Sequence, residues 1–97
     1  NVENTRGVVL RRLGRDQEAR VALQRALFYN HSHAAYNLAS LVKDDDPWTA
    51  VDAYRVALDG NCDGCPSRVD VLNELALALD KVGEPNDAVR VLEEAVA

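Results

Sequence analysis

Two histidines and two cysteines are the side chains of this 97-residue chain that could do chemistry. They are His31 and His33 in one stretch, and Cys62 and Cys65 in another. Imidazole and thiolate ligands can bind zinc tetrahedrally, although this histidine pair is closer in sequence than the ligand pairs of zinc fingers. The cysteines could instead form a disulfide that closes a short loop. We expect free thiols and no resident metal or cofactor, with the zinc site and the disulfide as alternatives.

Composition and charge exclude several other functions. The sequence has no glycine-rich phosphate loop and no metalloprotease helix motif, so it predicts a chain that is not an enzyme. Its net charge of -5 argues against a nucleic-acid surface, which needs clustered Lys and Arg. No apolar run approaches the roughly 18 residues of a membrane span. No signal peptide is visible, and no compartment is assigned.

Apolar residues recur at helical spacing in three stretches of the chain. In each stretch a small residue is followed by a large one after four residues and by another small one after seven, which forms one stripe of a helix. The three sets are Ala19, Leu23, Ala26, Leu27; Ala50, Tyr54, Ala57, Leu58; and Ala88, Leu92, Ala95, Val96.

A second small residue precedes each of these stretches. Gly7, Ala39 and Ala76 lie eleven or twelve residues before the first alanine of each set. Small groups at this separation suit two antiparallel helices that pack closely across a short turn, because bulky groups would hold the backbones apart. The sequence therefore predicts three helical hairpins.

The turns of these hairpins carry their own signals. Gly14 and Gly83 can adopt positive φ where a first helix ends. Asp16 and Asn86 could cap the second helices of the outer hairpins. The middle turn is one residue shorter and reads DDDPW, where Asp45 or Asp46 could cap the helix and Pro47 could be its first residue. We expect Trp48 to fill the space left by the missing residue.

The pattern resembles the tetratricopeptide repeat, a helix-turn-helix unit of about 34 residues. Three units cover nearly the whole chain, at about 1–31, 32–68 and 69–97. The aromatic residue of the family's second helix is kept only at Tyr54, and Arg6 replaces a leucine. The resemblance implies an all-α, right-handed superhelical solenoid. The RNA-binding pentatricopeptide repeat has a similar period, but the acid excess counts against it.

The resemblance also implies that the first helices line a concave face that holds an extended peptide or a partner subunit. Basic residues gather at one side of this face and acidic ones, including Asp80, at the other. Acids at Asp70 and Glu74 replace two cations with which some family members grip chaperone tails, so that ligand is disfavoured. The family's inward positions predict as binding residues Asn4, Val8, Arg11, His33, Tyr36, Asn37, Ser40, Lys43, Asp70, Asn73 and Leu77.

The alternative is a structural subunit that packs by its edges inside a larger assembly. The last helix, which ends in EEAVA, is predicted to leave an apolar face uncovered. Repeat arrays cover such a face with a polar terminal helix. We therefore expect either further sequence beyond Ala97 or a partner chain to cover it, and we expect the chain to be part of a longer protein or a larger complex.

Overall fold

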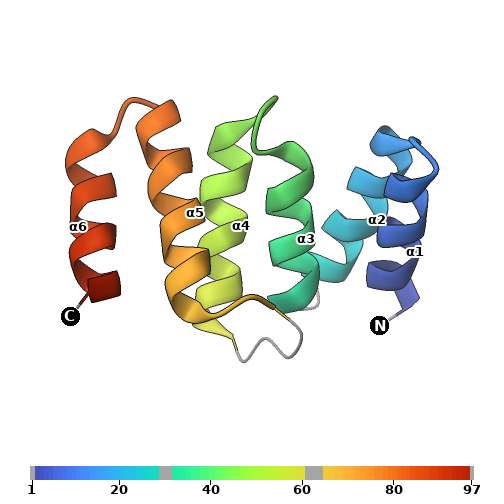
Figure 1. The fold of residues 1–97 in the computed structure, drawn as a ribbon. Helices are drawn as coiled ribbons and strands as arrows, with labels where there is room; N and C mark the ends of the chain where they lie inside the picture. The colour runs from blue at the N-terminus through green and yellow to red at the C-terminus, as the bar shows by residue number, and fades with distance from the viewer. Residues whose placement is uncertain (1, 29–31, 61–64, 97) are drawn as a thin grey trace.

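The computed structural model describes residues 2–28, 32–60 and 65–96. In these ranges the chain forms six α-helices and no β-strand: α1 (Val2–Arg12), α2 (Asp16–Phe28), α3 (Ser32–Val42), α4 (Pro47–Asp59), α5 (Arg68–Lys81) and α6 (Pro85–Val96). Figure 1 shows them following one another across the molecule in chain order. The fold is an all-α repeat solenoid, as the sequence predicts. No helix within the described ranges has the length and apolar character that a membrane crossing requires.

The small residues of the first helices lie where the paired helices approach each other. Gly7, Ala39 and Ala76 are all buried, and so are the alanines Ala19, Ala50 and Ala88 of the second helices. A Cβ atom on Gly7 would lie 2.5 Å from Leu23 Cγ and 3.4 Å from the Ala19 carbonyl oxygen. The α1–α2 hairpin therefore has no room for even a methyl group at position 7.

The two glycine turns have the same geometry. Gly14 has φ 76° and Gly83 has φ 85°. In the first turn the Arg15 amide donates to the Leu10 carbonyl at 2.9 Å, and the equivalent bond in the third turn has the same length. A hydrogen bond from the amide of one residue to the carbonyl five residues earlier is typical of a helix that ends at a residue in the left-handed conformation. The middle turn is tighter by one residue, because the Asp46 amide donates to the Val42 carbonyl at 2.7 Å.

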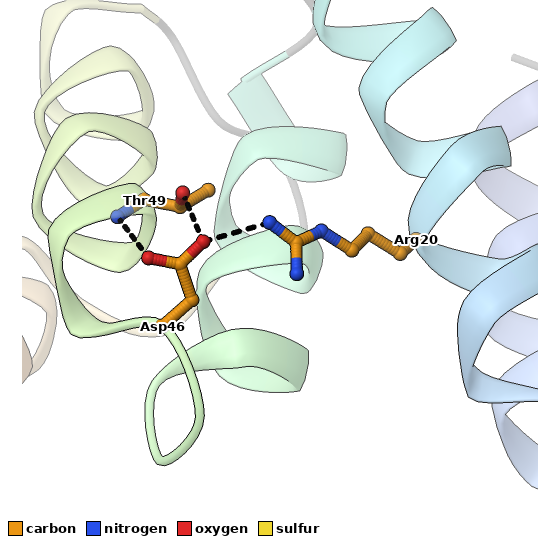
Figure 2. A network of polar contacts seen from close by, with 3 residues as sticks. All are labelled: Arg20, Asp46 and Thr49. Atoms are coloured by element: carbon orange, nitrogen blue, oxygen red, sulfur yellow. Dashed lines mark hydrogen bonds and ion pairs between the residues drawn. The ribbon is translucent and has the colours of Figure 1, made fainter.

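Asp46 starts α4 and also joins the first two hairpins. Its carboxylate accepts hydrogen bonds from the Thr49 amide at 3.3 Å and the Thr49 hydroxyl at 2.6 Å. The Arg20 guanidinium of α2 donates to the same carboxylate at 2.7 Å (Figure 2). The hydrogen bonds from Thr49 and then from Arg20 hold the pKa of Asp46 below its usual value. The predicted cap is confirmed at Asp46, with Pro47 as the first helical residue.

The caps predicted at Asp16 and Asn86 are wrong. The first helical hydrogen bonds of α2 and α6 are accepted by the carbonyls of Arg15 and Glu84. Asp16 and Asn86 consequently lie inside the first turn of their helices. Ser67, which the sequence analysis did not single out, caps α5 by accepting a hydrogen bond from the Asp70 amide at 3.2 Å.

Two apolar clusters form the core, and Trp48 belongs to neither. The larger cluster runs from α2 through α5 to Ala88 of α6. The smaller one contains Leu10, Ala19 and Ala22 of the first hairpin, and Leu41 packs against both clusters. Trp48 is 58% exposed, so the expectation that it fills space in the shortened turn is wrong. The middle turn closes through the Asp46 backbone bond and needs no side chain to fill it.

The substitution Gly7→Ala should lower the free energy of unfolding by about 1–2 kcal/mol, measured by urea denaturation. Overpacking typically costs about 1–3 kcal/mol, which exceeds the helix-propensity gain of about 0.5–1 kcal/mol. The same substitution in a Leu23→Ala background should become neutral or stabilising, because the clashing side chain is gone. Both backgrounds should be measured in sucrose, which strengthens the folded state. An equal loss in both backgrounds would contradict the steric explanation.

The substitution Asp46→Ala should cost about 1–2 kcal/mol at neutral pH, since a helix cap contributes about 1 kcal/mol and the Arg20 contact is lost as well. The matched control Asp45→Ala, at an exposed neighbour, should change stability by less than about 0.5 kcal/mol. Because folding lowers the pKa of Asp46, its contribution is present above the unfolded pKa of about 3.9 and is lost as the pH falls through the native value. The stability difference between parent and Asp46→Ala should therefore shrink below about pH 4.

Candidate protein-interaction surface

Polar contacts connect the first helices of the three hairpins. The Asn37 side-chain amide of α3 donates to Asn4 Oδ1 of α1 at 2.9 Å. Lys43, which directly follows α3, has its Nζ 3.6 Å from Glu74 Oε2 of α5. Because these contacts run from α1 to α3 and from the end of α3 to α5, the three helices share one surface. We call this surface, formed by α1, α3 and α5, the first-helix face.

The predicted binding residues differ in how far they can be reached from solvent. Asn4 is 8% exposed, and its bond to Asn37 gives it a role in joining α1 to α3. Exposed members of the predicted set are Arg11, Asp70, Asn73 and Leu77, and partly buried ones are Val8, His33, Tyr36, Asn37, Ser40 and Lys43. All of them lie on α1, α3 or α5 except Lys43, which directly follows α3. Their role in binding stays a prediction.

A surface pocket opens between the turn that follows α3 and the C-terminal half of α5. Its walls carry charges of both signs, and its apolar lining includes Leu77, which is 55% exposed. Two ion pairs flank it, Lys43 with Glu74 at 3.6 Å and Lys81 with Asp44 at 2.8 Å. The full lining is Lys43, Asp44, Glu74, Leu77, Ala78, Asp80 and Lys81. The sequence predicts Lys43 and Leu77 as binding residues, but it does not indicate that they line a pocket together.

Asp80 differs from the other acids of this pocket. Glu74 and Asp44 each face a lysine, and the Lys81 contacts hold the pKa of the Asp44 carboxyl below its usual value. Within the described part of the chain, no ion pair involves Asp80, which is exposed on the wall of the pocket. Its carboxylate is therefore accessible to a cationic group of a partner.

A buried tyrosine of α4 packs beneath the first-helix face. Tyr54 of α4 is fully buried, and its hydroxyl donates to Glu74 Oε2 at 3.3 Å. Its ring lies 6.1 Å from the ring of Tyr36 on α3, tilted by 56°. Burial first and the charge of Glu74 second raise the pKa of the Tyr54 hydroxyl, while a hydrogen bond with Ser40 acts in the opposite direction. Tyr54 thus connects the apolar core to the charged rim of the pocket.

The zinc and disulfide alternatives can be tested only at His33 and Cys65, because His31 and Cys62 lie outside the described residues. Cys65 is disulfide-bonded, so the expectation of a free thiol is wrong at this position. His33 is partly buried and makes a contact of its own. No group of three or more potential metal ligands occurs among the residues for which positions are given. A disulfided cysteine has no thiolate to offer a metal.

Comparison with protein-family models gives a match in the last third of the chain. Residues 68–97 match the family model of the tetratricopeptide repeat, and this segment contains α5 and α6. No curated protein sequence matches the chain. The family match and the succession of short paired helices agree with the repeat pattern that the sequence predicts.

The substitution Tyr54→Phe should lower the free energy of unfolding by about 1 kcal/mol at neutral pH, since one hydrogen bond contributes about 0.5–1.5 kcal/mol. Because folding raises the pKa of Tyr54, the native state keeps a proton that the unfolded chain loses above about pH 10. The parent should therefore lose more stability than Tyr54→Phe between about pH 9 and pH 11, measured by urea denaturation at each pH. Parallel pH profiles would show that Tyr54 titrates normally in the folded protein.

Proposed function

We propose that this tetratricopeptide-like repeat protein is a non-catalytic protein-interaction module that holds an extended peptide segment of a partner on its first-helix face. The family to which the chain is similar supports a role in protein–protein contact. The proposal goes further in naming the face, the pocket and the chemistry of the bound segment. The observation that carries it is the pocket between α5 and the turn after α3, where exposed Leu77 lies beside the exposed carboxylate of Asp80.

The pocket favours a basic side chain. A lysine or arginine of the partner could lay its aliphatic stem on Leu77 and bring its cationic end to Asp80. Glu74 and Asp44 are less suited to this role because Lys43 and Lys81 already face them. A contact of this kind buries apolar surface and pairs one charge. Small binding pockets typically combine an apolar lining with a few polar groups that give specificity.

The distribution of charge along the face gives the bound segment a direction. Exposed acids, Asp70 and Asp80, lie on α5, and exposed Arg11 lies on α1. A segment that carries its basic residues over α5 and an acidic residue over α1 matches this arrangement. Charge complementarity of this kind mainly sets orientation and association rate, because each exposed pair contributes only about 0–1 kcal/mol.

The test is a selection of binding peptides from a random display library with the intact chain as bait. Selected peptides should carry Lys or Arg, and Asp80→Lys should weaken their binding about tenfold, because an attraction of up to about 1 kcal/mol is replaced by a repulsion. Leu77→Ser should weaken it as well. The matched control Asp52→Lys makes the same charge change at an exposed position of α4 and should retain binding, which isothermal calorimetry can measure.

Two results would contradict the proposal. Selected peptides without basic residues would remove the role of Asp80. Peptides that bind Asp80→Lys and Leu77→Ser as tightly as the parent, but no longer bind Val89→Glu on α6, would place the interaction surface at the end of the array and favour the edge-packing alternative.

A further inference from the structure

The outer surface of α6 repeats the residues that join one hairpin to the next inside the array. Val89 and Leu92 stand 38 residues after Val51 and Tyr54, the separation that also relates Ala88 to Ala50. Val51 and Tyr54 are 2% and 0% exposed, whereas Val89 and Leu92 are 52% and 41% exposed. The difference follows from position, because α5 packs on α4 and no helix of the described chain packs on the outer side of α6.

The outer surface of α1 is the counterpart at the other end. Val2 and Val9 stand 32 residues before Ala34 and Leu41, the separation that also relates Gly7 to Ala39. Ala34 is fully buried in the core cluster and Leu41 packs against it. Val2 and Val9 are 82% and 47% exposed. The exposed face of α1 is therefore of the kind that packs on the preceding hairpin inside the array. The outer side of α6 has no helix of this kind from the described chain packed on it.

The two ends also carry opposite charge. Residues 1–31 contain six arginines against three acidic residues, whereas residues 69–97 contain seven acidic residues against one lysine and one arginine. Arg6 and Arg12 are exposed on α1, and Glu93 is exposed on α6, whose Glu94 is paired with Arg68 of α5. Like ends repel and unlike ends attract, so charge selects a head-to-tail arrangement over a tail-to-tail one.

We propose that the apolar face of α6, formed by Val89 and Leu92, packs on the face of α1, formed by Val2 and Val9, of a second copy of this chain. The contact continues the hairpin stacking from one molecule into the next. It uses two different surfaces, so it can extend to chains of molecules and does not close as a two-fold dimer. Arg6 occupies the position of the buried Leu38 and Leu75, which makes the contact weaker than an internal one and sensitive to salt.

The test uses three substitutions of one type at valines of similar exposure. Val9→Glu blocks the α1 end, Val89→Glu blocks the α6 end, and Val21→Glu is the matched control. These valines are 47%, 52% and 48% exposed. Val21 aligns with the exposed Asp52 of α4 and belongs to neither the Val2 and Val9 face nor the Val89 and Leu92 face. Circular dichroism should show that all three variants remain helical.

Sedimentation equilibrium over a concentration series distinguishes the possibilities. The average mass of the parent and of Val21→Glu should rise above the 10.6 kDa of one chain, and less so in high salt. Val9→Glu and Val89→Glu alone should each associate at least about tenfold more weakly, because a buried unpaired carboxylate is costly. A mixture of the two should form a complex of two chains that does not grow further, since its outer faces are both blocked.

Three outcomes would overturn the proposal. They are a parent that stays at the mass of one chain at every concentration, association of Val9→Glu equal to that of the parent, and a mixture of the two blocked variants with no mass above that of one chain. None of these outcomes bears on peptide binding at the pocket between α5 and the turn after α3, so the two proposals can fail separately.

Discussion

The close approach of the two helices within each hairpin is the constraint on which the rest of the structure depends. Gly7 leaves no space for a methyl group against Leu23, and the alanines at the equivalent positions are buried. Because the two helices of a hairpin lie close together at the small residue, the large residue of the second helix can also contact the next hairpin. Leu23 and Tyr54 are both fully buried there. Small residues within a hairpin and large residues between hairpins are thus two parts of one packing arrangement.

The same arrangement explains why the first-helix face is polar. Consecutive first helices are joined by the Asn37–Asn4 bond and the Lys43–Glu74 ion pair, while the apolar contacts of these helices are directed at their neighbours in the stack. These hydrogen bonds and ion pairs hold the first helices together and still leave part of the polar side chains accessible to solvent. The first-helix face can therefore be rigid without being apolar. The one large apolar side chain exposed on α5 in the pocket, Leu77, then stands out as a contact point for a partner.

The sequence predicted the features that depend on local chemistry. Helix spacing, the left-handed glycines and the Asp46 cap are set by a few neighbouring residues, and the structure confirms them. Features that depend on the exact start of a helix or on contacts between hairpins were missed. Asn86 falls inside α6 because the Glu84 carbonyl begins that helix, and Trp48 stays exposed because the backbone closes the short turn. Prediction of the pocket required knowing which side chains of α5 and of the turn after α3 lie close together, and no single stretch of sequence contains that information.

The first hairpin has a small separate apolar cluster, and this affects how binding acts on the protein. That cluster contains Leu10, Ala19 and Ala22, and the hairpin joins the main core through Leu23 and Ala26 of α2 and through Leu41 of α3. Stacked repeats are stabilised mainly by contacts with their nearest neighbours, so a terminal repeat with a small core opens first. Anything that binds across α1 and α3, or that packs on the exposed side of α1, binds the folded first hairpin and not the opened one. Binding at either surface would therefore stabilise this hairpin through mass action, with no change in the contacts of the other two.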